Sequence, residues 1–162
     1  MPTESKEYAD MDAALTAVLG TLLGVAATHW FQSRATERTA TLARDEQLRQ
    51  ERIATYSAFA GALVDYRHSQ NDRWFRALEV PGTETAEEAR YASYARRRAA
   101  SQALFRVQLV CDDPETRQLA EIAFEVTNGI HEANDEEDRA SRGAQAKEAI
   151  SSFISAAAPG VR

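Results

Sequence analysis

The 162-residue sequence has very few residues of the kinds that interrupt helices or cross-link a chain. It holds four prolines and seven glycines, and its single cysteine, Cys111, excludes both an internal disulfide framework and a cysteine-based zinc site. Alanine, arginine, glutamate and leucine are abundant, and these residues favour helices. The length leaves room for one domain and an anchor. The sequence therefore predicts an all-α protein.

The sequence also lacks the common signatures of catalysis. GxSxG, SxxK, HExxH and a glycine-rich phosphate loop do not occur, and the three histidines are far apart. Asp65-x-x-His68 followed by Asp72 is one loose copy of a motif that di-iron bundles need twice. The acidic run 135–138 lacks the spacing of an EF-hand and predicts a solvated loop. We therefore expect that the protein is not an enzyme and that it has no catalytic, metal-binding or cofactor-binding residues.

A net charge of −6 argues against general affinity for nucleic acid, because neutralising phosphates requires a surplus of basic side chains on one surface. One long segment of the sequence has no charged residues. Residues 13–33 contain no charged side chain, and Trp30 stands near the end of this run. About 20 apolar residues suffice to cross a bilayer, so the segment predicts a transmembrane helix. Its apolarity is mild, which leaves two alternatives: a core helix of a soluble bundle, or a signal peptide cleaved after Ala27.

Small residues recur every four positions within this segment, at Thr16, Gly20, Gly24 and Thr28. On a helix they form one stripe along which two backbones can approach closely, and Gly20–Gly24 is a GxxxG match. The stripe predicts self-association, and we expect a homo-oligomer.

The charges flanking residues 13–33 predict the orientation in the membrane. One lysine precedes the segment, whereas five arginines follow it between positions 34 and 52. Positively charged residues are retained on the cytoplasmic side. We expect a single-pass protein of the cell membrane with its N-terminus outside and the remainder in the cytoplasm.

The remaining sequence predicts a stalk and a bundle. We expect an acidic tail over 1–12, the transmembrane helix over 13–33, a stalk helix continuing it over 34–52, a small antiparallel helical bundle over 53–158 and a tail over 159–162. No proline occurs between Pro2 and Pro81, so nothing forces a break before residue 79. A capping box at Thr85–Glu88 and an Asp113–Pro114 helix start predict the next two helices.

Apolar spacing predicts the core faces of these helices. In the first bundle helix the expected core residues are Ile53, Tyr56, Phe59, Ala60, Leu63, Val64, Trp74 and Leu78. In the helices that follow they are Tyr94, Leu104, Phe105, Val107 and Leu109, then Leu119, Ile122, Ala123 and Val126, and finally Ile150, Phe153, Ile154 and Ala157.

One basic cluster is interleaved with aromatic residues. It comprises Arg90, Arg96, Arg97 and Arg98, with Tyr91 and Tyr94 between them. Three consecutive arginines spread around a helix, so the cluster predicts a broad interaction surface. Anionic lipid and nucleic acid are alternatives to a protein as its partner. Within the chain, Glu121, Glu125 and Glu132 are the expected acidic partners, in exposed pairs that each contribute little.

"ERIATYSAFAGAL" (51–63) and "ALFRVQLVCDDPETRQLAEIAFE" (103–125), behind a glycine-containing N-terminal span, resemble a group of small uncharacterised membrane-anchored proteins of high-GC actinobacteria. Tyr56 and Phe59 match the Tyr-x-x-Phe core of that group, and Pro114–Glu115 matches its Pro-Glu turn. Arginine outnumbers lysine 17 to 2, which suits a GC-rich genome. The resemblance implies an architecture and no reaction.

The leading hypothesis is therefore a non-enzymatic, membrane-anchored scaffold. It would associate with itself and present its bundle to a protein partner. Two alternatives remain open: a bundle that senses a small apolar ligand or a metal, and an exported soluble protein.

Overall fold

The computed structural model describes the backbone of residues 3–161 and the side chains of Trp30, Arg34 and residues 39–161. Four α-helices make up nearly all of this chain: α1 (Thr3–Glu79), α2 (Glu84–Val110), α3 (Pro114–Asn128) and α4 (Glu136–Ala157). Two short 3₁₀ helices, η1 (Gly129–Glu132) and η2 (Ala158–Val161), follow α3 and α4. Residues 3–161 contain no β-strand, which confirms the all-α prediction.

Helix α1 continues to Glu79, as the absence of proline before Pro81 predicts. The chain divides into two compact units, Met1–Glu46 and Gln47–Arg162. The division falls inside the segment that we expected to be a stalk.

The predicted transmembrane helix receives no support from the structure. Within the part of the chain whose residues are described, no helix has a stretch long and apolar enough to cross a bilayer. Residues 13–33 are helical in their backbone, but among their side chains only that of Trp30 is described. The stripe Thr16, Gly20, Gly24 and Thr28 lies outside the described side chains.

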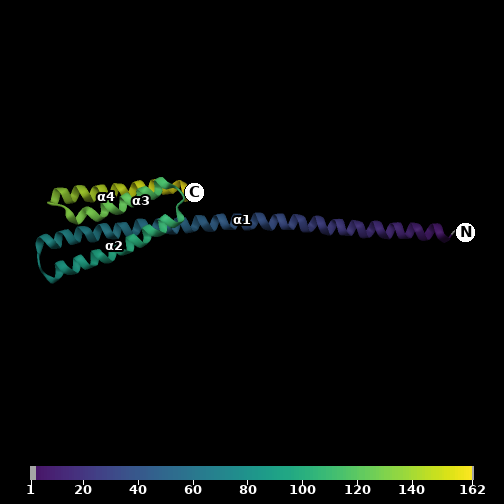
Figure 1. The fold of residues 1–162 in the computed structure, drawn as a ribbon, viewed down its shortest axis with the longest axis horizontal. Helices are drawn as coiled ribbons and strands as arrows, with labels where there is room; N and C mark the ends of the chain where they lie inside the picture. The colour runs from purple at the N-terminus through teal and green to yellow at the C-terminus, as the bar shows by residue number, and fades with distance from the viewer. Residues whose placement is uncertain (1–2, 162) are drawn as a thin grey trace. The chain divides into compact units, whose positions relative to one another are not determined.

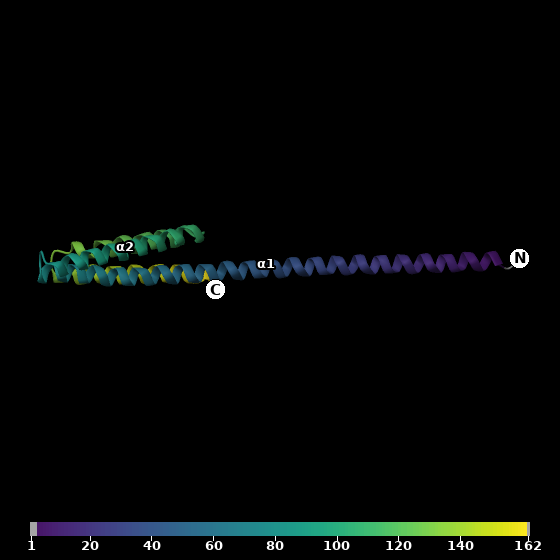
Figure 2. The same cartoon turned by 90° about the horizontal axis from the view of Figure 1, so that it is seen from below.

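Within residues 47–161 the four helices run antiparallel in chain order, and Figures 1 and 2 show this arrangement from two sides. The connections are short, as expected for antiparallel neighbours. The first begins at Val80 and contains Gly82, whose φ of 74° suits a residue without a Cβ.

The N-terminus of α2 differs from the predicted one. Thr83 caps the helix, its hydroxyl accepting a hydrogen bond from Ala86 N, so the capping box at Thr85–Glu88 is wrong. The turn at Gly82 ends two residues earlier than the sequence suggested, and Thr83 is therefore the first side chain able to reach the free amides.

Helix α3 begins as predicted. Asp113 Oδ2 accepts hydrogen bonds from Thr116 N at 2.8 Å and from Thr116 Oγ1 at 2.6 Å. These bonds hold the pKa of the Asp113 carboxyl below its ordinary value. Pro114 occupies the first turn, where the missing amide hydrogen costs nothing.

The core is formed by apolar side chains from all four helices. Phe153 of α4 meets the edges of two rings from α1, with ring centroids 5.1 Å from Phe59 and 5.9 Å from Tyr56. Across the bundle, the ring centroids of Tyr66 and Phe124 are 6.0 Å apart. The predicted core residues Tyr56, Phe59, Leu63, Trp74, Leu104, Val107, Ala123, Ile150, Phe153 and Ala157 are buried.

Seven residues predicted for the core are exposed instead: Val64, Leu78, Tyr94, Phe105, Leu109, Ile122 and Ile154. In α2 the reason is visible in the buried face, which includes Ala89, Ser93 and Ala100. Small side chains let the first part of this face pack closely against its neighbours, and Leu104 and Val107 complete it. Tyr94, Phe105 and Leu109 lie outside this face.

Candidate interaction surface

The outer side of α2 carries four exposed large apolar or aromatic side chains. Tyr91, Tyr94, Phe105 and Leu109 are 61%, 47%, 57% and 84% exposed. With 3.6 residues per turn, spacings of three, four, seven and four residues place Tyr91, Tyr94, Arg98, Phe105 and Leu109 on one side of the helix. We call these five residues the outer α2 surface; it extends about 27 Å along the helix.

Contacts at both ends of α2 hold this surface in position. Near the helix N-terminus, Arg73 of α1 lies over the ring of Tyr94, with its guanidinium carbon 5.4 Å from the ring centroid. Near the C-terminus, Gln108 Nε2 donates a 2.8 Å hydrogen bond to Glu121 Oε1 of α3. Arg52 of α1 donates to Val110 O at 3.3 Å and to Asp112 Oδ2 at 2.5 Å.

The predicted arginine cluster is divided by the fold. Arg96 Nη1 pairs with Asp65 Oδ2 of α1 at 3.2 Å, so this side chain joins two helices. Arg90 lies 4.0 Å from Glu87 and over the ring of Tyr91. Arg97 and Arg98 are exposed, and only Arg98 belongs to the outer α2 surface. The four arginines do not form one site.

The acidic partners expected for this cluster are not used. Among the described residues, no ion pair joins Glu121, Glu125 or Glu132 to any of the four arginines. Arg96 pairs with Asp65 instead, because it lies on the side of α2 that faces α1. Glu121 and Glu125 are exposed, and Glu121 accepts a hydrogen bond from Gln108 of α2.

The Asp65, His68 and Asp72 constellation borders an open cleft of about 390 Å³, together with Ser69, Ala92 and Arg96. Arg96 already neutralises Asp65, and His68 contacts Arg67 rather than a carboxylate. The described residues contain no group of three His, Cys, Asp or Glu side chains that could hold a metal ion.

A buried polar cluster that the sequence did not predict joins α1 to the end of α3. Tyr66 Oη donates to Asn128 Oδ1 at 2.7 Å, and Gln70 Nε2 donates to Asn128 O at 2.7 Å. His131 Nδ1 lies 2.8 Å from Asn128 O and 3.0 Å from Gln70 Nε2. Burial raises the pKa of Tyr66 to about 12, and it lowers that of His131. The residue that could have indicated this cluster in the sequence is Gln70, a polar residue on the otherwise apolar face of α1.

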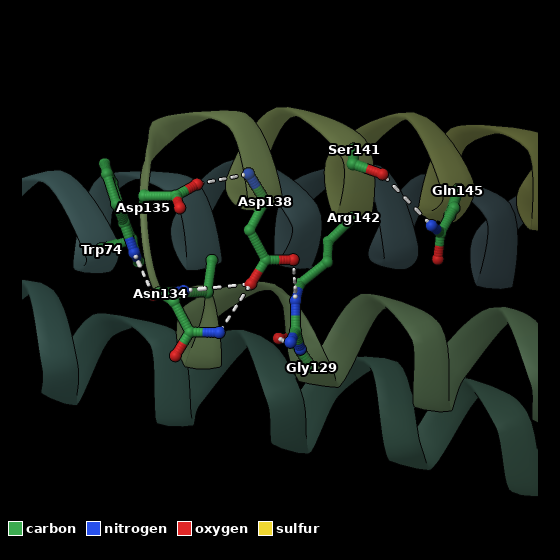
Figure 3. Close-up of polar contacts among 9 residues, drawn as sticks. Trp74, Gly129, Asn134, Asp135, Asp138, Ser141, Arg142 and Gln145 are labelled. Carbon is green, nitrogen blue, oxygen red and sulfur yellow. Dashed lines mark hydrogen bonds and ion pairs between the residues drawn. The ribbon is translucent and has the colours of Figure 1, made fainter.

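The acidic run 135–138, predicted to be a solvated loop, begins α4. Asp135 caps the helix by accepting a 2.8 Å hydrogen bond from Asp138 N. Asp138 Oδ1 receives Arg142 Nε at 2.8 Å, and Arg142 Nη1 donates to Gly129 O at 3.0 Å (Figure 3). The prediction missed the α4 start because four consecutive acidic residues obscured the capping position. The Arg142 contacts join α4 to η1.

An apolar groove of about 240 Å³ lies between α1 and the end of α4, where its lining includes Ile53, Tyr56, Phe153, Ile154 and Val161. Two of its lining residues, Tyr56 and Phe153, also contact each other edge to face. Apolar side chains thus meet solvent both in this groove and on the outer α2 surface.

The fold and these surfaces define a small all-α bundle whose distinctive exposed feature is an aromatic and arginine-containing helix face. The family model of the KilB plasmid transfer protein matches residues 53–161, which include almost all of the bundle. The chain therefore belongs to the KilB plasmid transfer protein family. No curated protein and no solved structure matches it.

Proposed function

We propose that this chain takes part in plasmid transfer as a non-enzymatic helical interaction protein. The match of the KilB plasmid transfer model to residues 53–161 carries the proposal, because the matched region is the bundle. Within the bundle, the outer α2 surface provides the contact area. Tyrosine, phenylalanine and arginine are enriched at protein interfaces, and residues of all three types lie on this helix face.

In this proposal residues 13–33 anchor the chain in the cell membrane, with the bundle in the cytoplasm. The support is in the sequence: 21 uncharged positions followed by five arginines within twenty residues. The stripe of Thr16, Gly20, Gly24 and Thr28 would bring copies together there. The excess of arginine over lysine also supports an origin in a GC-rich actinobacterium.

A mating assay tests this function. The donor carries a plasmid from which the coding sequence has been deleted, and the full chain or a chain lacking residues 13–33 is supplied separately at matched protein levels. We expect the deletion to lower the transfer frequency, the full chain to restore it and the shortened chain to fail. Unchanged transfer from the deleted plasmid would overturn the proposed role.

A further inference from the structure

A cavity of about 280 Å³ opens beside the turn between α1 and α2, at the end of the bundle opposite to the C-terminus (Figure 1). Small or apolar residues make up part of its wall, and the charged side chains that line it are Arg73, Glu87 and Arg90. Two guanidinium groups, one from each helix, therefore border one small space.

Each of these two arginines lies over a tyrosine ring. The guanidinium carbon of Arg73 is 5.4 Å from the ring centroid of Tyr94, and that of Arg90 is 5.4 Å from the ring centroid of Tyr91. The two rings meet edge to face, with centroids 6.3 Å apart. A guanidinium stacked on a ring keeps the N–H donors at its edge available for other partners. The tyrosine pair thus holds both cations in place without using their donors.

The protein satisfies few of these donors. Within residues 39–161, whose side chains are described, Arg73 has no ion pair and no side-chain hydrogen bond. Arg90 pairs with Glu87, but Nη2 and Oε1 are 4.0 Å apart, which is too far for a hydrogen bond. Both arginines can therefore donate to an added ligand.

The other carboxylates of this region do not cancel the positive charge of the cavity. On α1, Asp72 and Glu79 pair with Arg76. On α2, Glu84 and Glu88 are exposed and do not line the cavity. The described lining thus carries two positive charges and the single negative charge of Glu87, and this surplus favours an anion.

We propose that the cavity binds a phosphate group held between the guanidinium groups of Arg73 and Arg90. A guanidinium donates two parallel hydrogen bonds to phosphate or carboxylate oxygens. A carboxylate presents two oxygens, which one guanidinium occupies, whereas a phosphate monoester presents three and can bridge two guanidiniums. The space beside Ala77, Pro81 and Ala86 accommodates a small organic group attached to the phosphate.

Titration calorimetry of the full chain in a mild detergent, with inorganic phosphate at constant ionic strength, tests the proposal. We expect saturable binding that Arg73→Gln weakens about tenfold, because charge-assisted hydrogen bonds are lost. The matched control is Arg106→Gln, which removes an exposed arginine elsewhere on α2 and should leave the affinity unchanged. Absence of saturable binding, or equal losses in the two variants, overturns the proposal.

Glu87→Gln provides a second test of opposite sign. Its carboxylate competes with phosphate for Arg90, so its removal should strengthen phosphate binding about threefold, the size expected for an exposed charge pair. Glu148→Gln makes the same change in net charge at an exposed position of α4 and should have no effect. A gain in both variants, or in neither, contradicts the proposed site.

Two further ligands distinguish the sources of the phosphate group. Binding of glycerol 1-phosphate that Arg73→Gln weakens identifies a free phosphate monoester as the ligand. Binding of phosphatidic acid alone, in mixed micelles and with the same dependence on Arg73, identifies a lipid headgroup. If neither ligand shows this dependence, the proposal is wrong. These measurements use the purified chain, so a failure of the role in plasmid transfer would not alter them.

Discussion

At the residue scale, His131 shows how burial alters the chemistry of a single side chain. It lies in the polar cluster with Tyr66, Gln70 and Asn128. Burial is the largest cause of its lowered pKa; the positive charges of Arg73 and Arg97 act in the same direction, while the bond to Asn128 O and the charge of Glu132 oppose them. The folded protein therefore favours the neutral imidazole.

This preference predicts a pH-dependent stability. Because the pKa of His131 is lower in the folded chain than its ordinary value of 6.5, the unfolded chain binds more protons as the pH falls below 6.5. We expect the free energy of unfolding to be highest above pH 6.5 and to decrease as the pH falls from there. Denaturant titrations between pH 5 and 8 measure it. A His131→Gln variant should show a smaller slope, and an identical slope would contradict the assignment to His131.

A second prediction at this scale concerns the core. Phe153 is fully buried against Tyr56 and Phe59, so Phe153→Ala removes two ring contacts and leaves a cavity. We expect a loss of about 3–5 kcal/mol in the free energy of unfolding. The adjacent Ile154 is 48% exposed, so Ile154→Ala should cost much less. Similar losses for both variants in denaturant unfolding would place the core on the wrong face of α4.

At the element scale, the caps decide where the helices begin. Asp135 caps α4 and lies in an acidic run that hides its role in the sequence. Asp135→Ala should cost about 1 kcal/mol of stability, whereas Asp135→Asn, which retains a capping oxygen, should cost little. Denaturant unfolding of the two variants gives the comparison. Equal losses would show that the negative charge, and not the capping bond, matters at this position.

The helices differ in how far their sequences predict them. Asp113 followed by Pro114 is an unambiguous helix start, and the structure confirms it. The start of α2 was misplaced because Thr85 has a glutamate three residues later, as a capping box requires, whereas Thr83 has Ala86 at that position. Only the turn at Gly82 selects Thr83 as the cap. Local sequence identifies that a helix begins, but the turn before it determines where.

The faces of the helices were harder to predict. In α4, Ile150, Phe153 and Ala157 are buried as expected. In α2, hydrophobicity alone assigned Tyr94, Phe105 and Leu109 to the core, whereas close packing selected Ala89, Ser93 and Ala100. Because Tyr94, Phe105 and Leu109 were assigned to the core, the sequence did not predict the outer α2 surface to which they belong. Of the predicted arginines, only Arg98 belongs to the outer α2 surface.

At the scale of the whole molecule, we expect the full chain to sediment with membranes. Residues 13–33 carry no charge, so lipid can surround them without burying an ionised side chain. Lysed cells are centrifuged at high speed with and without a mild detergent, after a high-salt wash that removes peripheral proteins. Release should require detergent. A chain that remains in the supernatant without detergent has no anchor at 13–33.

The orientation of the chain gives a separate prediction at this scale. The five arginines between 34 and 52 predict that the C-terminus lies in the cytoplasm. A C-terminal fusion to a reporter that is active only outside the cytoplasm should be inactive, while the same reporter at the N-terminus should be active. The reverse pattern would place the bundle on the opposite side of the membrane.

The central claim is that the bundle acts in plasmid transfer through the outer α2 surface. The most direct measurement is the transfer frequency of a plasmid whose copy of this gene carries Phe105→Glu, compared with Leu78→Glu at equal protein levels. The account predicts that Phe105→Glu lowers transfer towards the level of the deletion, while Leu78→Glu transfers like the unmodified plasmid. Normal transfer with Phe105→Glu would contradict it.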